Sequence, residues 1–183
     1  MKTRIHIFGA SGSGTTSIAK SVCDAISYSH FDSDHYFWMP TGNPFTVERP
    51  QVERISLMEY ELSNCDRWIL SGSLTGWGDT LIPLFDLVVF VSVPKEIRIE
   101  RLKKREYERY GDDVLPCGKR YDETNAFLEW AASYDAGTRN GRSLPKHEKW
   151  LEGIECQVAR VTNLVFVDSI NDVIKAINGI ETD

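Results

Sequence analysis

The sequence predicts an α/β fold, in which a parallel β-sheet carries helices on both of its faces. Segments with strand character alternate along the chain with segments whose apolar residues recur at helical spacing. The run Leu87–Val91 is apolar at every position, as is typical of a parallel strand that is buried on both faces. A chain of 183 residues suits one domain with a sizeable core, so we expect residues 1–183 to form a single domain.

The first element is a strand at Thr3–Phe8, in which Ile5 and Ile7 share one face and His6 and Phe8 the other. A helix follows the glycine-rich segment after it, because apolar residues there form one stripe. The stripe contains Ile18, Ala19, Val22, Ala25 and Ile26. Further strands are expected at Ser29–Asp32, Trp68–Leu70 and Leu87–Val91. The last strand is either Gln157–Val161 or Leu164–Val167, and the sequence does not choose between them.

Helices account for most of the remaining chain. Apolar spacing and capping residues place them at Val47–Asn64 (starting near Pro50), from Pro94 to about Tyr110, around Phe127–Tyr134, at Leu144–Leu151 and at Asn171–Ile177. Residues 40–45 include Gly42, Asn43 and Pro44 and are expected to be irregular. The polar segment Gly111–Tyr121, with two glycines and a proline, is expected to be a flexible loop.

Composition excludes several classes of protein. The net charge of −6 argues against non-specific binding to nucleic acid, which depends on basic residues. No apolar run is long enough to span a bilayer, and Met1–Arg4 leads directly into a strand without a signal peptide. The four cysteines are scattered, without metal-binding or disulfide spacing. We therefore expect a cytoplasmic protein, monomer or homodimer, that binds neither nucleic acid nor membranes.

The segment Gly9–Thr16 fits the phosphate-binding motif G-x-x-x-x-G-K-[ST] except at one position, where Thr15 replaces the lysine. The strand before it and the helix after it provide the context in which backbone N–H groups bind phosphate. The residues expected to contact a nucleotide are Gly9, Ser11, Gly12, Ser13, Gly14, Thr15 and Thr16. The alternative is a glycine-rich turn without a ligand.

Two carboxylates follow the second predicted strand, beside the phosphate loop. Asp32 and Asp34 are two residues apart, so both side chains can face the same cleft. We expect Asp32 to join Thr16 at a Mg²⁺ ion, and Asp34 to bind or deprotonate a substrate hydroxyl. The alternative for both is a cap for a helix or turn at His35–Trp38.

The third predicted strand ends in Ser71–Ser73, at the same edge of the sheet. Gly72 and Ser73 are candidates for substrate binding, because glycine permits close approach and serine supplies a hydroxyl. The alternative is a tight turn. Arg49 is a candidate for contact with the acceptor substrate. The aromatic residues belong either to an acceptor pocket or to the core, and they are Tyr36, Phe37, Trp38 and Trp77.

Three arginines lie on one face of the helix after Pro94, at spacings i, i+3 and i+7. Arg101 and Arg105 are expected to recognise phosphate or stack on a base, whereas Arg98 is expected on a solvated face. The alternative for all three is a solvated face paired with Glu100, Glu106 and Glu108.

A second basic segment follows the predicted helix around Phe127–Tyr134. Arg139 and Arg142 lie there beside Gly137 and Gly141, and they are candidates to close over phosphates. His147 is expected to be a structural or surface residue rather than a catalyst.

Together these motifs resemble the small P-loop kinases, which include adenylate, shikimate and gluconate kinases. Phe31–Asp34 resembles the Phe-x-Asp-Ser-Asp of shikimate kinases, and Ser71–Ser73 stands where those enzymes carry glycines. Arg101 and Arg105 are similar to the paired arginines that, in adenylate kinases, stack on adenine and begin a lid. The resemblance implies a three-layer α/β/α fold with sheet order 2-3-1-4-5, a short lid at 111–121 and an acceptor-binding insertion at 36–64.

The same resemblance implies that the γ-phosphoryl group of ATP moves to a small acceptor in the presence of Mg²⁺. The acceptor classes left open are nucleotides, nucleosides and hydroxy acids. The residues expected to act in catalysis are Asp34, Arg105 and Arg142.

Three features depart from that family's pattern. Thr15 replaces the loop lysine, the lid lacks cysteines for zinc, and Val91–Val93 contains no metal-binding aspartate. Lys119 and Arg105 are candidates to replace the missing cation, whereas Lys20 projects to the opposite side of its helix. Two other functions remain open, a nucleotide-binding regulator without turnover and a simple NTPase.

Overall fold

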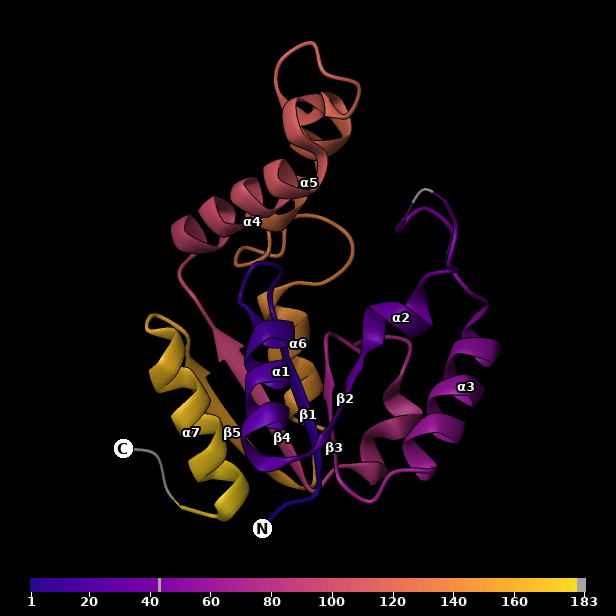
Figure 1. Cartoon of the computed structure of the whole chain (residues 1–183), viewed down its shortest axis with the longest axis vertical. Helices are drawn as coiled ribbons and strands as arrows, with labels where there is room; N and C mark the ends of the chain where they lie inside the picture. Colours follow the sequence, from indigo (N-terminus) through magenta and orange to yellow (C-terminus); the bar gives the residue numbers. More distant parts are fainter. Residues whose placement is uncertain (43, 181–183) are drawn as a thin grey trace.

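The computed structural model of the chain describes residues 1–42 and 44–180. Five parallel strands form one sheet in the order β2-β3-β1-β4-β5 (Figure 1). They are β1 (Arg4–Gly9), β2 (Ser29–Asp32), β3 (Trp68–Ser71), β4 (Leu87–Ser92) and β5 (Gln157–Thr162). The predicted fold class and strand order are confirmed.

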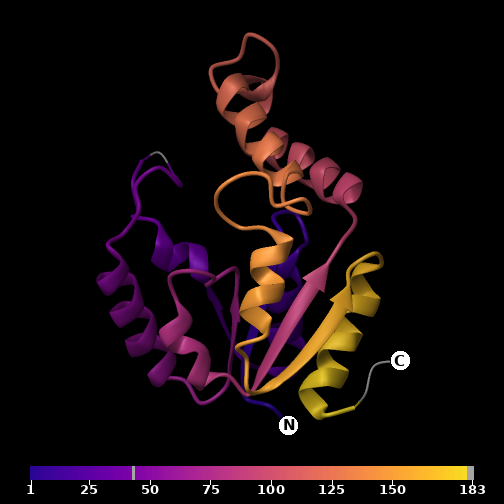
Figure 2. The same cartoon turned by 180° about the vertical axis from the view of Figure 1, so that it is seen from behind.

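Helices cover both faces of the sheet. On one face lie α1 (Thr15–Ile26) and α7 (Phe166–Asn178) (Figure 1). On the other lie α6 (Leu144–Leu151), α3 (Gln51–Ser63) and the 3₁₀ helix η1 (Asp79–Leu84) (Figure 2). Across residues 1–42 and 44–180, no helix combines the length and the apolar character needed to cross a membrane.

The two faces of the sheet bury separate hydrophobic clusters, and β4 contributes to both. Leu87, Val89 and Val91 pack against α1 and α7, whereas Val88 and Phe90 pack against α3, η1 and α6. Because consecutive residues of a strand point to opposite faces, a strand covered on both sides needs an apolar residue at every position. This packing explains the continuous apolar run in the sequence.

A helical projection, which we call the lid, extends beyond the carboxyl ends of the strands, and closure of residues 111–121 over a nucleotide remains a prediction. The lid consists of α4 (Lys95–Tyr110), the 3₁₀ helix η2 (Gly111–Val114) and α5 (Tyr121–Ala132) (Figure 1). The start of the expected flexible loop, Gly111–Val114, is therefore helical. The short helix α2 (Ser33–Phe37) follows β2, on the side of the molecule away from α7 (Figure 1). The described part of residues 40–45 contains no helix or strand, and Asn43 lies outside the described residues.

The structure resolves the ambiguity over the last strand. Gln157–Thr162 pairs in parallel with β4, whereas Leu164 and Val167 are 55% and 62% exposed. The apolar run at 164–167 therefore lies on the surface at the start of α7, which begins five residues earlier than predicted. Sequence alone did not show this, because apolar character does not distinguish a strand from a helix start.

Two histidines, His6 and His147, are fully buried. Burial lowers the pKa of His6 from 6.5 to about 3, against a hydrogen bond to the Leu70 carbonyl that raises it. Burial likewise lowers the pKa of His147 from 6.5 to about 3, with further lowering by Arg142. Both rings are neutral in the folded state but take up protons at higher pH in the unfolded chain.

We therefore expect the free energy of unfolding to be highest above pH 6.5 and to fall as the pH decreases from 6.5 towards 3. Each histidine contributes a loss of up to about 1.4 kcal/mol per pH unit. Urea unfolding between about pH 6.5 and 5 isolates this effect, because most carboxylates remain ionised there. Burial also lowers the pKa of His30, so in that interval His6→Phe should remove between about a third and a half of the slope. A flat profile for the wild type would contradict the prediction.

Candidate active site

The glycine-rich loop connects β1 to α1 at the carboxyl edge of the sheet. Gly12 and Gly14 have φ angles of 82° and 85°, which favour glycine. A Cβ atom at Gly12 would lie 2.6 Å from the carbonyl oxygen of Arg98, so α4 packs directly against the loop. No side chain caps the start of α1, and its first N–H groups are available to an anion.

Asn163, which the sequence analysis missed, holds this loop in place. Its side-chain Nδ2 donates to the carbonyl oxygen of Ser13 at 2.9 Å, and its own carbonyl accepts from Arg101 Nη2 at 3.1 Å. Ser169 Oγ donates to Asn163 Oδ1 at 3.1 Å. Asn163 directly follows β5. Asp32 was singled out because it lies at the end of a predicted strand, and the same criterion would have identified Asn163 if the position of the last strand had been known.

The two residues predicted to bind a metal ion lie together. Thr16 Oγ1 donates to Asp32 Oδ2 at 3.0 Å, and Asp32 Oδ1 accepts from the N–H of Asp34 at 3.0 Å. Asp32 thus also caps α2, which was the alternative interpretation. A hydroxyl and a carboxylate fit Mg²⁺, which prefers oxygen ligands. Among the residues that the structure describes, no three His, Cys, Asp or Glu side chains cluster as a metal cage.

Asp34 lies in the first turn of α2 with an exposed side chain that neighbouring protein atoms partly desolvate. This desolvation raises the pKa of Asp34, and Asp32 raises it further, while Arg142 and Arg105 oppose the shift. Burial lowers the pKa of Arg142, and Asp34 counteracts it. The three residues predicted to act in catalysis are thus near enough for their charges to influence one another, and their roles remain predictions.

The three arginines of α4 have different environments. Arg105 Nη2 pairs with Glu106 Oε1 at 2.8 Å, and the guanidinium lies 5.7 Å from the Phe127 ring centre. Arg101 contacts Asn163 beside the phosphate loop.

The expectation that Arg98 lies on a solvated face is wrong, because its side chain is completely buried. It donates to the carbonyl oxygens of Val93 and Ala131 at 3.0 and 3.4 Å, and it forms an ion pair with Asp135. Arg98 therefore fixes the returning helix of the lid to the end of β4.

The two arginines of the basic segment between α5 and α6 also differ in their environments. Arg139 pairs with the exposed Glu129 at 2.8 Å, on the surface. Arg142 is half-buried and its guanidinium lies 5.4 Å from the Trp130 ring centre. Lys119, a candidate replacement for the loop lysine, is exposed in the segment at the tip of the lid, away from the phosphate loop (Figure 1).

Several residues predicted to bind the acceptor make contacts with other parts of the protein. A Cβ atom at Gly72, where φ is 97°, would collide with the Ser33 hydroxyl, so the close packing of α2 on β3 requires glycine. The Ser73 hydroxyl lies 3.2 Å from His147 Nε2. Arg49 Nε donates to the carbonyl oxygen of Tyr36 at 3.0 Å. Contact of these residues with an acceptor remains a prediction.

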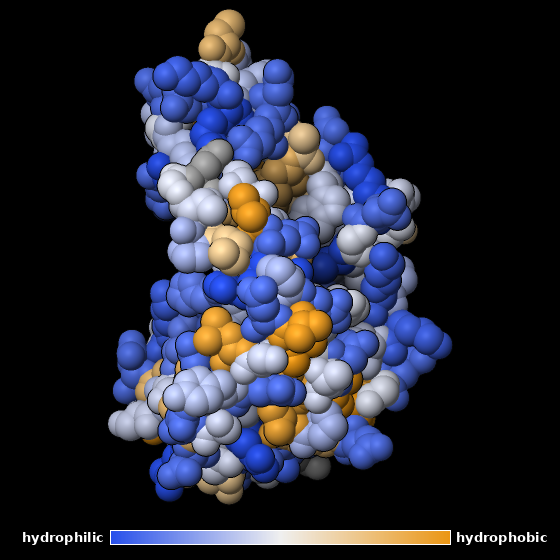
Figure 3. All heavy atoms as spheres, turned by 90° about the vertical axis from the view of Figure 1, so that its right-hand side faces the viewer, coloured by the Kyte–Doolittle hydropathy of each residue, from blue (hydrophilic) through white to orange (hydrophobic). Residues whose placement is uncertain are grey.

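The aromatic residues Tyr36, Phe37, Trp38 and Trp77 belong to the same acceptor side of the site. Phe37, Trp38 and Trp77 are partly exposed, whereas Tyr36 is buried in the core. Arg54, which the sequence analysis missed, lies 3.9 Å from the Phe37 ring centre and 5.2 Å from that of Trp77. Figure 3 shows a recess beneath the lid, with hydrophobic atoms at its upper wall, on a largely hydrophilic face.

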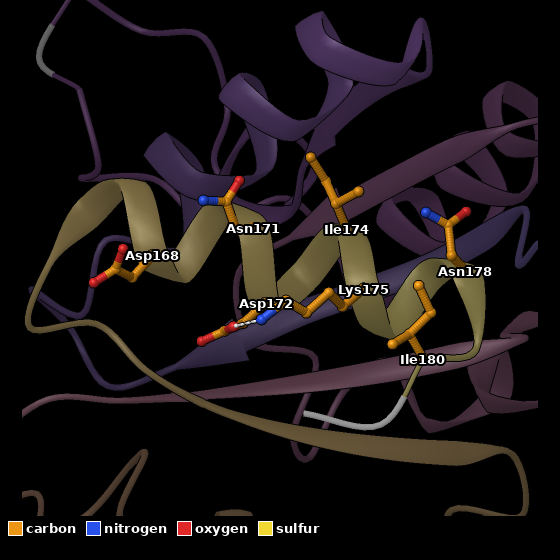
Figure 4. Close-up of a pocket in the computed structure, with 7 residues that line it drawn as sticks. All are labelled: Asp168, Asn171, Asp172, Ile174, Lys175, Asn178 and Ile180. Carbon is orange, nitrogen blue, oxygen red and sulfur yellow. Dashed lines mark hydrogen bonds and ion pairs between the residues drawn. The ribbon is translucent and has the colours of Figure 1, made fainter. Parts of the chain in front are cut away.

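A second hollow has no connection with these residues. It is an open groove of about 440 Å³ along α7, lined among others by Asp168, Asp172 and Lys175 (Figure 4). Asp172 and Lys175 pair with each other at 3.2 Å. The groove includes no residue of the candidate site, and we assign it no role.

Comparison with solved structures identifies the fold. A shikimate kinase from Bacteroides thetaiotaomicron aligns with a TM-score of 0.58 and 16% identity, over 97% of this chain and 99% of that one. A gluconokinase from Sinorhizobium meliloti aligns with a TM-score of 0.51 and 13% identity, over 97% of this chain and 92% of that one. The chain therefore has the fold of the P-loop kinases.

Sequence comparison identifies the family. No protein-family model matches the chain. A cytidylate kinase from Archaeoglobus fulgidus is 26% identical over 114 residues, 56% of this chain and 62% of that protein. The uncharacterized protein YqaC from Bacillus subtilis is 43% identical over 161 residues, 88% of this chain and 89% of that protein. The chain belongs to the same family as YqaC, built on the P-loop kinase fold.

Proposed function

We propose that the protein is an ATP-dependent kinase that transfers the γ-phosphoryl group to a hydroxyl of a small-molecule acceptor. The observation that carries this proposal is the position of Asp34, which is linked through Asp32 to Thr16 in the first turn of α1 and is influenced by the charges of Arg105 and Arg142. A protein that only binds nucleotide has no need of a carboxylate among arginines at the place where an acceptor would lie. The kinases with the same fold and the cytidylate kinase similarity support the proposal.

In this mechanism the loop Gly9–Gly14 binds the phosphates through its backbone N–H groups. The acceptor oxygen attacks the γ-phosphorus, the bond to the β,γ-bridging oxygen breaks, and ADP leaves with that oxygen. Asp34 accepts the proton of the acceptor hydroxyl, and its raised pKa makes it a stronger base. Arg105 and Arg142 neutralise the negative charge on the transferred group.

Thr16 and Asp32 would hold Mg²⁺, which supplies charge neutralisation between the β- and γ-phosphates when it is bound. Arg101, beside the loop, is the residue we assign to the adenine base. Of the described acceptor-side residues, we assign Asp34 and the partly exposed aromatics to binding the acceptor.

The test is transfer of radiolabel from [γ-³²P]ATP to panels of nucleosides, nucleotides and hydroxy acids, with Mg²⁺ present. We expect labelled product with at least one of these classes. Phosphate release without an acceptor would instead indicate a simple NTPase. ATP binding without transfer to any acceptor would favour a regulator without turnover, the alternative that Thr15 supports.

The effect of Thr15→Lys tests how the site manages without its lysine. Arg105 and Arg142 already place positive charge around Asp34, so a further ammonium at position 15 adds repulsion rather than a missing contact. We expect turnover that is unchanged or lower, measured in the same transfer assay. Conservative Thr15→Ser serves as the control. A turnover increase of about tenfold or more would show that the position has merely lost a catalytic cation.

A further inference from the structure

Three polar side chains form a hydrogen-bonded chain inside an aromatic part of the core. Tyr134, His147 and Ser73 are all buried, and the His147 ring lies edge-on to Phe8 at 4.9 Å between ring centres. Tyr134 Oη lies 2.8 Å from His147 Nδ1, and Ser73 Oγ lies 3.2 Å from His147 Nε2. Polar groups are costly in such surroundings unless they are fully paired, so this chain has one defined geometry.

The direction of the bonds follows from the partners. The Ser73 hydroxyl donates to Thr75 Oγ1 at 3.2 Å, so it accepts from His147 Nε2–H. His147 Nδ1 then accepts from the hydroxyl of Tyr134. Burial keeps the His147 ring neutral and Tyr134 protonated, since it lowers the pKa of His147 to about 3 and raises that of Tyr134. The ring is thus a neutral tautomer with the proton on Nε2.

This chain of bonds lies at the base of the loop that carries Arg142. The loop, residues 135–143, leaves the end of α5 just after Tyr134 and returns to α6, which contains His147. The N–H of Leu144 donates to the Tyr134 carbonyl at 2.9 Å, so side-chain and backbone bonds both close the loop base. Arg142 is near enough for its charge to disfavour protonation of His147.

We propose that Tyr134 and His147 are positioning residues, whose hydrogen bond closes the base of the 135–143 loop and so fixes the position of Arg142. Ser73, which follows β3, accepts a hydrogen bond from His147 Nε2 and so fixes the tautomer of His147. This bond orients the loop relative to the carboxyl edge of the sheet, where we place the acceptor. The inference rests on the proposed function for its catalytic consequence but not for its geometry. It gives a role to a histidine that the sequence analysis treated as structural or surface.

Tyr134→Phe is the sharpest variant, because it removes one hydroxyl and keeps the packed ring. Tyr28→Phe is a matched control: the Tyr28 hydroxyl is bound to the carbonyl oxygen of Lys2 at 2.8 Å, and Tyr28 and Tyr134 are 7% and 6% exposed. Each variant loses one hydrogen bond of a buried tyrosine, so we expect similar falls of a few degrees in Tm. Tyr28 lies in the segment between α1 and β2, apart from the loop.

The first measurement needs no enzymatic activity. Hydrogen exchange at Nε of Arg142 is followed by ¹⁵N NMR, with the signal assigned through Arg142→Lys. We expect exchange to accelerate by about tenfold or more in Tyr134→Phe and to remain unchanged in Tyr28→Phe. Equal protection of Arg142 in both variants would overturn the proposal, whether or not the protein proves to be a kinase.

The second measurement separates positioning from general stability. We expect Tyr134→Phe to lower kcat by about tenfold with KM for ATP unchanged, because misplacement of a catalytic group is costly. In an Arg142→Ala background the same change should lower kcat by less than about twofold, since Tyr134 acts through Arg142. A full tenfold loss in both backgrounds would overturn the proposal. Absence of transfer in the wild type would instead refute the proposed function, and the exchange measurement would still decide the positioning role.

Discussion

Replacing Asp34 with asparagine should lower phosphoryl transfer by about 10³-fold, the largest catalytic effect that we expect from a single substitution. Asparagine has nearly the same shape but cannot accept the acceptor's proton. It keeps the backbone N–H that donates to Asp32, so the start of α2 should remain intact. We expect the Kd for ATP, measured by calorimetry, to change by less than about threefold, because the phosphate loop is untouched.

Asp24→Asn is the matched control for this experiment. Asp24 is an exposed residue of α1, and the same change of charge there should leave transfer unaffected. Turnover of Asp34→Asn within about tenfold of the wild type would mean that Asp34 is not the base. Turnover would then have to depend on the arginines and the phosphate loop alone.

Removing Asp135 should cost the largest amount of stability that we expect from a charged residue, about 3 kcal/mol in the free energy of unfolding. Its partner Arg98 is completely buried between β4 and α5, and within the described part of the chain its further hydrogen-bond acceptors are the carbonyl oxygens of Val93 and Ala131. Asp135→Ala therefore leaves a positive charge without a counter-ion in the interior. Urea unfolding at neutral pH measures the loss.

The double variant Arg98→Met/Asp135→Ala distinguishes this cause from a general loss of packing. Methionine fills much of the same space without charge, so we expect at least half of the lost stability to return. Glu129→Ala breaks the Arg139–Glu129 pair, whose side chains are 47% and 67% exposed, and should cost less than about 1 kcal/mol. A double variant less stable than Asp135→Ala alone would show that Arg98 acts mainly through its packing and its bonds to the backbone.

Local sequence patterns predicted the elements that depend on local physics. The apolar alternation and glycine positions located β1, the phosphate loop and α1, and the range Leu144–Leu151 agrees with the helix bounds at both ends. Thr16 and Asp32, which were predicted to lie at one metal site, are within hydrogen-bond distance of each other, and metal binding by them remains a prediction. These features can be predicted from the spacing of residue types along the chain and from the geometry of a strand, a turn or a helix.

Other features depended on contacts between distant segments. The charge pattern of α4 did not reveal that Arg98 is buried, because Asp135 and Ala131, which surround it, come from the end of the lid. Asn163 is 150 residues from Ser13, whose carbonyl it holds. A pattern within one helix records which side chains share a face, but not what covers that face.

The sequence by itself determined the α/β architecture, and it located the glycine-rich loop Gly9–Thr16 and the carboxylates beside it. Only the tertiary structure decided that Arg98 is buried against Asp135 and that a buried Tyr134–His147 bond closes the Arg142 loop. The physical reason is that backbone periodicity is set by near neighbours. Burial and charge proximity, by contrast, are set by which surfaces pack together after the chain has folded.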